Sequence, residues 1–402
     1  MLTVTGGVYR ELCTRPRWDE WYGSAGRGAA SIARLRGSAR LATYLDKASD
    51  DVTRTRAEFE GFEVIGEPVE AVASFNYLHA LKSPRIQQLD VTFPTLEVCD
   101  ASVLCYGIVE GNIHVDAETV VYDPQNVERL QSFRANDSRA DRLAIVCNRR
   151  EASLLLGELA ANPFEMAGRL AEKEKADVVV LKLGPMGAVV CDNGRISRVP
   201  AFHTSRVWKI GSGDQFAAHF AHAWIEEGRS PDHAASLASL GTAYYCQFGG
   251  FPTPEELSAF APTPLNVSEA FKSGYIPTVY LAGPFFTLAQ LWLVQEARKC
   301  LLSMGLKVFS PYHDVGLGTA DEVVVKDLRG IEECDVVLAI GDGFDPGTIF
   351  EVGYARSKGK PVIVYVENET SEGTKMMDGT DCKLVPDFVT AIYFTAWAAV
   401  SA

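Results

Sequence analysis

Between Thr278 and Val366, short apolar runs alternate with helical patterns, and this alternation constrains the fold more than any other feature of the chain. Short apolar runs bounded by turns are typical of buried strands, whereas apolar residues three or four apart are typical of helices. Alternating strands and helices form a parallel sheet that helices cover on both faces. The predicted strands lie within 278–286, 305–311, 335–340 and 360–366.

Two carboxylates, Asp345 and Glu351, are six residues apart across a predicted loop-to-helix junction. Thr348 is predicted to cap the helix, and Glu351 then falls in the first helical turn. There the positive end of the helix dipole favours an ionised carboxylate, which suits attack on a sugar carbon. A capped helix with an acidic first turn explains the same segment equally well.

Tyr280, Asp345 and Glu351 lie at or beyond the carboxyl ends of predicted strands, where ligands bind in such sheets. With Asp327 on a predicted helix, residues 278–366 resemble the nucleoside 2-deoxyribosyltransferase family. The resemblance implies a flavodoxin- or Rossmann-like doubly wound domain in which Glu351 is the nucleophile that takes the sugar C1′. It also implies that Asp327 and Asp345 bind the base and move a proton to it, while Tyr280 orients Glu351.

The segment 284–290 is apolar and uncharged, so it lacks the positive charge with which a loop grips phosphate. This favours an unphosphorylated nucleoside, with Gly283, Phe285 and Phe286 as substrate-binding residues and the two rings as a stacking wall. A place in the core is an equally ordinary explanation for both rings. Relatives borrow an Asn from a neighbouring subunit, which implies a homo-oligomer. Because 369–377 offers no equivalent, deoxyribosyl transfer and hydrolysis both stay open.

Upstream, Gly211, Ser212 and Gly213 precede Asp214 at the start of a strongly helical segment. Small residues at a helix start let backbone N–H groups converge on an anion, and Asp214 is placed to deprotonate a hydroxyl that attacks a γ-phosphate. A glycine turn with an acidic first helical turn is the commoner explanation of this motif alone.

With three further segments, residues 1–260 resemble the PfkB, or ribokinase-like, sugar and nucleoside kinases. These segments are Asn148-x-x-Glu151, Gly184-x-x-Gly187 and the glycine-rich run 23–30. The resemblance implies a ribokinase-like α/β/α domain with a small lid, whose strands are predicted at 62–65 and 73–79. It implies ATP and Mg²⁺ as cofactors, with Glu151 acting on the metal indirectly, whereas none is implied for the rear domain. The residues assigned to cofactor binding are Gly211, Ser212, Gly213, Asn148, Glu151, Gly184 and Gly187.

The front region departs from the kinase pattern at three places. Residues 208–210 replace the usual Asp-Thr-Thr run, Arg27 replaces a sugar-binding Asn, and Glu11 falls where an Asp grips substrate hydroxyls. Arg27 and Glu11 as substrate-binding residues point to a ligand with its own anionic group. An active kinase and a binding module that no longer transfers phosphate both stay open.

Composition narrows the class of protein. Prolines recur between 252 and 277, which predicts a linker between a domain at 1–251 and another at 278–402. A net charge of -14 disfavours DNA or RNA polymers as partners. No apolar run predicts a membrane span, no signal peptide is evident, and the nine scattered cysteines suggest reduced thiols in a cytoplasmic protein.

The sequence therefore predicts an enzyme that cleaves the N-glycosidic bond of a nucleoside through Glu351. The front domain would phosphorylate or sense a related metabolite, with a nucleoside or nucleobase and possibly ATP as small-molecule partners. Two alternatives are a PfkB-type kinase with a structural rear domain and a regulator in which neither site turns over.

Overall fold

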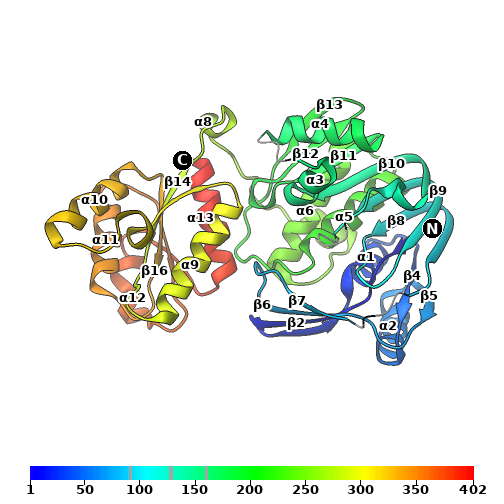
Figure 1. The fold of residues 1–402 in the computed structure, drawn as a ribbon, viewed down its shortest axis with the longest axis horizontal. Helices are drawn as coiled ribbons and strands as arrows, with labels where there is room; N and C mark the ends of the chain where they lie inside the picture. Colours follow the sequence, from blue (N-terminus) through cyan, green and yellow to red (C-terminus); the bar gives the residue numbers. More distant parts are fainter. Residues whose placement is uncertain (89, 91–92, 126–129, 159–161) are drawn as a thin grey trace. The chain divides into compact units, whose positions relative to one another are not determined.

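The computed structural model describes residues 1–88, 90, 93–125, 130–158 and 162–402. Its chain contacts divide it into two compact units, Met1–Pro264 and Leu265–Ala402. The division falls within the proline-rich stretch 252–277. Figure 1 shows both units as helices packed around sheets.

The main sheet of the first unit contains nine strands among the described residues, in the order β13-β12-β11-β10-β9-β8-β1-β4-β5. Neighbours from β5 to β11 are parallel, and β12 and β13 are antiparallel additions at the other edge. The strands are β1 (Leu2–Thr5), β4 (Ala39–Leu45), β5 (Glu63–Pro68), β8 (Leu96–Tyr106), β9 (Ile113–Asp123), β10 (Arg139–Asn148), β11 (Val178–Lys182), β12 (Ala188–Asp192) and β13 (Arg195–Val199).

Helices cover both faces of this sheet, because its central strands are apolar on both sides. One buried cluster joins the sheet to α1, α2, α5 and α6, and a second cluster joins it to α3 and α4. The three layers form the α/β/α arrangement expected from the ribokinase-like resemblance. The helices are α1 (Gly23–Arg34), α2 (Lys47–Glu60), α3 (Arg149–Leu156), α4 (Pro163–Glu174), α5 (Ser212–Ala221), α6 (Pro231–Phe248) and α7 (Pro254–Ala259).

A separate four-stranded sheet of the first unit corresponds to the predicted lid. Its order is β3-β2-β6-β7, from β2 (Arg10–Arg15), β3 (Trp18–Trp21), β6 (Ser74–His79) and β7 (Arg85–Gln87). The lid strand predicted at 73–79 is therefore confirmed as β6. The lid strand predicted at 62–65 is wrong, because α2 returns the chain so that β5 pairs in parallel with β4 at the edge of the main sheet.

The second unit is built on an all-parallel sheet in the order β15-β14-β16-β17-β18. The chain leaves β14 for β15 on one side and returns to β16 on the other, which is a topological switch point of a doubly wound sheet. This confirms the fold class predicted from the alternation. The strands are β14 (Thr278–Ala282), β15 (Lys307–Phe309), β16 (Val336–Ile340), β17 (Val362–Tyr365) and β18 (Lys383–Val385).

Five longer helices accompany this sheet: α9 (Leu288–Ser303), α10 (Ala320–Glu333), α11 (Pro346–Ser357), α12 (Ser371–Asp378) and α13 (Phe388–Ser401). The apolar α13 packs on β16 and β17 of its own unit, with Ala391, Ile392, Thr395 and Ala396 buried. Among the described residues, no helix has the length and hydropathy needed to cross a bilayer. All nine cysteines are free thiols, and only Cys99 is exposed.

Candidate functional sites

Tyr280 and Glu351 meet at the carboxyl edge of the second unit's sheet. Tyr280 lies in β14 beside the switch point, and Glu351 comes from α11, which follows β16. The Tyr280 hydroxyl donates a hydrogen bond of 2.6 Å to Glu351 Oε1. The two residues are 71 positions apart, so their predicted neighbourhood depends on the packing of α11 against β14.

The start of α11 differs from the predicted capping pattern. Asp345, rather than Thr348, is the N-cap, and its Oδ2 accepts from the Thr348 N–H at 2.8 Å and from the Thr348 hydroxyl at 2.9 Å. Because Asp345 takes the cap, α11 begins at Pro346 and Glu351 lies in its second turn. The predicted position of Glu351 in the first turn is therefore wrong, and Asp345 has a structural role in addition to any role toward a base.

Burial dominates the electrostatics of Glu351. It raises the pKa of Glu351 to about 7; the Tyr280 hydrogen bond opposes this rise, and the carboxylates of Asp327 and Asp345 add to it. The expectation that the helix dipole keeps Glu351 fully ionised is thus replaced by a carboxyl group that titrates near neutral pH. Burial also raises the pKa of Asp327, whose Oδ1 is buried without a hydrogen-bond partner among the described residues.

The ring of Tyr280 packs against a second aromatic ring. Phe309, the last residue of β15, stacks on it with ring centroids 5.4 Å apart and an interplanar angle of 19°. The Phe309 ring fits only because residue 330 of α10 is glycine, since a Cβ there would lie 2.6 Å from Phe309 Cε1. This close approach also carries Asp327, one turn earlier on α10, toward the Tyr280–Glu351 pair.

The aromatic pair after β14 is not part of the core. Phe286 is 72% exposed, and Phe285 lies between Phe286 and Tyr312, at 5.2 Å and 5.4 Å between ring centroids. Gly283 packs closely between Ile340 and Val294, so it serves the packing of β14. At the N-terminus of the following helix, α9, Thr287 and Gln290 form a capping box, which satisfies two of the backbone N–H groups there.

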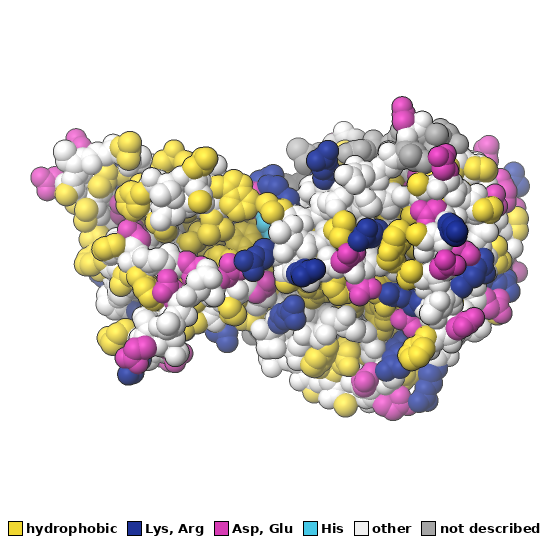
Figure 2. Space-filling model, turned by 90° about the horizontal axis from the view of Figure 1, so that it is seen from below, with side chains coloured by type: hydrophobic (Ala, Val, Ile, Leu, Met, Phe, Trp, Pro, Cys, Tyr) yellow, Lys and Arg dark blue, Asp and Glu magenta, His cyan; other side chains and the backbone are white. Residues whose placement is uncertain are grey.

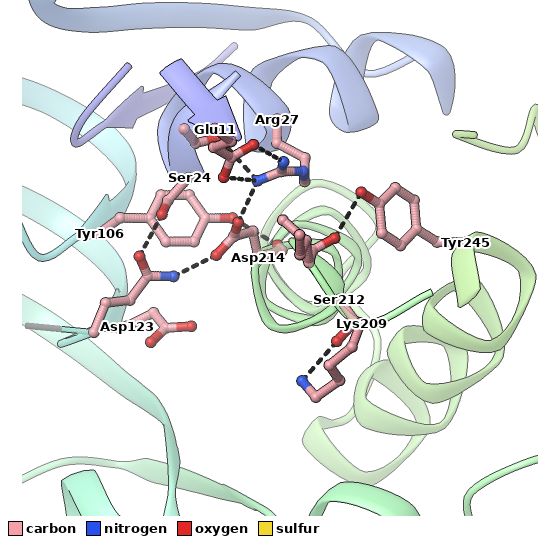
Figure 3. Close-up of polar contacts among 12 residues, drawn as sticks. Glu11, Ser24, Arg27, Tyr106, Asp123, Lys209, Ser212, Asp214 and Tyr245 are labelled. Carbon is pink, nitrogen blue, oxygen red and sulfur yellow. Dashed lines mark hydrogen bonds and ion pairs between the residues drawn. The ribbon is translucent and has the colours of Figure 1, made fainter. Parts of the chain in front are cut away.

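In the first unit, the Gly-x-Gly-Asp motif lies at the start of α5, as predicted. Gly211 is the N-cap with a φ of 77°, and Ser212, Gly213 and Asp214 form the first turn. Tyr106 reaches this turn from β8 and donates to the Asp214 carbonyl at 2.7 Å. Figure 3 shows Tyr106, Ser212 and Asp214 at the start of this helix.

Arg27 joins the two acids of this site. Its Nη1 donates to Asp214 Oδ2 at 2.7 Å and to Glu11 Oε1 at 3.3 Å, and its Nη2 pairs with Glu11 Oε2 (Figure 3). The Arg27 side chain has no exposed surface. Burial disfavours its charged form, but Glu11 and Asp214 outweigh this effect and hold the pKa of Arg27 above its usual value.

Four polar residues near Asp214 were not predicted from the sequence: Gln125, Asp123, Lys182 and Lys209. Gln125 follows β9 and donates from Nε2 to Asp214 Oδ1 at 2.5 Å. Lys182 Nζ, at the end of β11, pairs with Asp123 Oδ2 at 2.7 Å, and Lys209 Nζ donates to the Ser212 hydroxyl at 2.8 Å. Asp123 and Lys182 each end an apolar strand, and a polar residue in that position was the available signal.

Two family models match the chain, one in each unit. The pfkB family carbohydrate kinase model matches residues 102–249, and the nucleoside 2-deoxyribosyltransferase model matches residues 279–381. The chain is a fusion of a pfkB-like and a deoxyribosyltransferase-like domain. The pfkB match begins after Glu11 and Arg27, two of the three places at which the sequence departs from the kinase pattern, and it includes the third, residues 208–210.

Solved structures resemble the pfkB-like domain in fold. The fructokinase from Vibrio cholerae O395, in its form bound to fructose, ADP and calcium, is 17% identical, with a TM-score of 0.50. The ribokinase from Thermotoga maritima is also 17% identical, with a TM-score of 0.48. Each match covers 64% of this chain and 98% of the solved chain. A search of curated proteins found no match.

The remaining motif residues of the pfkB-like domain have structural roles. Asn148 caps α3 and forms a reciprocal capping box with Glu151, whose Oε2 accepts from the Asn148 N–H at 2.7 Å. Gly184 and Gly187 form the turn between β11 and β12, with φ values of 60° and 85°. In the described part of the chain, no group of three or more His, Cys, Asp or Glu side chains is arranged to hold a metal ion. The indirect role of Glu151 toward Mg²⁺ stays a prediction.

Hydrophobic side chains are exposed on the deoxyribosyltransferase-like domain, as Figure 2 shows. Those over the α9, α10 and α11 segments include Phe286, Leu288, Trp292, Leu317, Val325 and Phe350. Several of these side chains lie in or next to the elements that contain Tyr280, Asp327 and Glu351, which are β14, α10 and α11. Apolar surface of this kind marks a ligand-binding or protein-binding face.

Proposed function

We propose that the deoxyribosyltransferase-like domain cleaves the N-glycosidic bond of a nucleoside, with Glu351 as the nucleophile. The observation that carries this proposal is the half-buried Glu351 carboxyl group, which accepts a hydrogen bond from Tyr280 at the switch point of the sheet. A sugar carbon that develops oxocarbenium character is stabilised by a carboxylate, and ligands of doubly wound sheets bind at this edge. The exposed Phe286 ring offers a stacking surface for the base or the sugar.

The residues support a two-step substitution. The ionised Glu351 oxygen bonds to C1′ as the C1′–N bond breaks, and the electron pair of that bond goes to the base nitrogen. Asp327, whose pKa burial raises, supplies the proton that the departing base takes up. A second base or a water molecule then attacks C1′ and releases the Glu351 carboxylate.

The covalent intermediate provides the test of this proposal. A 2′-fluorinated 2′-deoxynucleoside slows the second step, because fluorine destabilises the oxocarbenium-like transition state. We expect a peptide containing Glu351 to gain the mass of the fluorinated sugar, with release of one base per active site in mass spectrometry and chromatography. Base release without any modified Glu351 peptide would contradict the nucleophile assignment, and no base release from any nucleoside would contradict the proposed function.

Replacing Tyr280 by Phe tests the electrostatics of the pair. The variant loses the hydrogen bond that stabilises ionised Glu351, so the pKa of Glu351 should rise further above its value of about 7. A hydrogen bond to a charged group contributes about 1.5–3 kcal/mol, and part of that loss would move the acid limb of the kcat/KM profile upward by about one pH unit. The measurement is base release between pH 5 and 9. An unchanged acid limb would show that Tyr280 does not tune Glu351.

For the whole chain we propose a nucleoside or nucleobase as the small-molecule partner and a homo-oligomer as the assembly. The apolar surface beside Glu351 supports an association of this kind. Within the same proposal, the pfkB-like domain phosphorylates or senses a related metabolite, with ATP as the phosphate donor if it transfers phosphate. Light scattering after size-exclusion chromatography measures the oligomeric state directly.

A further inference from the structure

Asp214 has little room to act on an acceptor hydroxyl. A general base must lie about 2.6–3.2 Å from the oxygen whose proton it takes. Arg27 already donates to one Asp214 oxygen at 2.7 Å, and Gln125 donates to the other at 2.5 Å. Asp214 as a whole is only 8% exposed. Each Asp214 oxygen keeps a second lone pair, but because so little of Asp214 is exposed, an acceptor hydroxyl reaches it only if Arg27 or Gln125 moves aside.

Arg27 is also difficult to displace. It lies directly against the start of α5, since a Cβ on Gly211 would be 2.1 Å from Arg27 Nε. The Gly23 carbonyl accepts from Nη1 at 3.2 Å, and Glu11 engages both terminal nitrogens. Moving the guanidinium away would leave the Glu11 and Asp214 carboxylates buried and unpaired, which is costly in a protein interior.

The charge balance argues against the anionic ligand that the sequence suggested. One guanidinium lies between two carboxylates, so the three groups carry a net charge of -1 when all are ionised. Arg27 therefore has no excess positive charge to offer to a phosphate or a carboxylate. Its partners lie within the protein.

We propose that Arg27 is a built-in occupant of the acceptor side of the pfkB-like domain, where it excludes sugar and nucleoside hydroxyls from Asp214. The guanidinium takes the hydrogen bonds that an acceptor would make, and Glu11 on the lid strand β2 holds it there. Arg27 thus determines specificity by exclusion. Because the domain as folded does not present its base to these hydroxyls, the contacts of Arg27 favour sensing over phosphoryl transfer among the two proposed roles of this domain. This inference does not depend on Glu351, and its test involves only the first unit.

The test removes the Arg27 side chain and then asks whether a sugar or a guanidinium compound binds in its place. Arg27→Ala removes the occupant, and we expect ribose or 2-deoxyribose at about 100 times its Kd to raise the Tm of the variant by about 5 °C. Methylguanidinium, which mimics the missing group, should compete with the sugar and abolish the shift. The wild-type protein should show no shift. Arg34→Ala is the matched control, because Arg34 lies on the same helix with a side chain that is 52% exposed.

Two results would overturn the proposal. One is a sugar-dependent Tm shift in the wild-type protein that Asp214→Asn abolishes, because it would show that acceptors reach the base past Arg27. The other is a folded Arg27→Ala protein that responds to none of these ligands. If Arg27→Ala does not fold, the double variant Arg27→Ala with Glu11→Gln removes one unpaired carboxylate, and the same two criteria apply to it.

Discussion

Replacing Glu351 by Gln is expected to lower the rate of base release by about 10⁴-fold, which is the scale of loss when a catalytic nucleophile or its base is removed. Gln keeps the shape of the side chain and can still contact the Tyr280 hydroxyl, but its amide does not form the glycosyl bond. Because binding contacts are kept, the loss should appear in kcat more than in KM. The measurement is the steady-state rate at which free base is released, with the base quantified by chromatography.

A measurement of stability distinguishes this loss of activity from a loss of folded protein. The pKa of Glu351 is raised to about 7 in the folded protein, above that of an unfolded Glu, so ionising Glu351 costs folding free energy as pH rises through 7. Gln does not carry this cost, and the variant should be at least as stable as the wild type at pH 8. Glu333→Gln is the matched control, because its side chain is 63% exposed and pairs with Arg329 in the same helix. A variant that retains full base release would rule out Glu351 as nucleophile.

Replacing Glu11 by Ala is expected to lower the free energy of unfolding of the first unit by about 3–5 kcal/mol. The change leaves Arg27 completely buried with one of its two carboxylate partners missing. Burial disfavours the charged guanidinium, and after the change only the Asp214 carboxylate offsets that cost. Calorimetry reports the change, and so does chemical denaturation followed by tryptophan fluorescence, because four of the six tryptophans lie in the first unit.

A surface ion pair provides the comparison for Glu11. Glu63 pairs with Arg40 at 2.9 Å, and their side chains are 58% and 31% exposed. Glu63→Ala should cost at most about 1 kcal/mol, because water screens and replaces the pair. Equal costs for the two variants would show that the Glu11–Arg27 contact does not hold the buried network together.

Much of the second unit was predictable, because its sequence patterns are local. Its strands are apolar runs between turns, and its helices carry apolar residues at helical spacing, so the parallel sheet followed from the order of elements. The pairing of Tyr280 with Glu351 was expected from the family resemblance, and the structure brings the two side chains together. Their roles in catalysis stay a prediction.

The local errors have a common physical origin. Thr348 and Asp345 are both good cap residues, and only the path of the chain out of β16 determines that Asp345 takes the cap. The strand at 62–65 was assigned to the lid because its pattern does not reveal its partner, which is β4 through a parallel pairing. Strand pairing is a long-range property, so an isolated strand pattern does not specify its sheet.

By itself, the sequence determined the two α/β domains, their order, and the candidate acids at the helix starts, since these depend on residue type and short spacing. Only the tertiary structure decided the state of those acids. Burial sets the pKa of Glu351 near 7, and Arg27 contacts Asp214 from 187 residues away. Solvent exclusion and ion pairing across the fold depend on which side chains finally share a low-dielectric interior, and spacing along the chain does not contain that information.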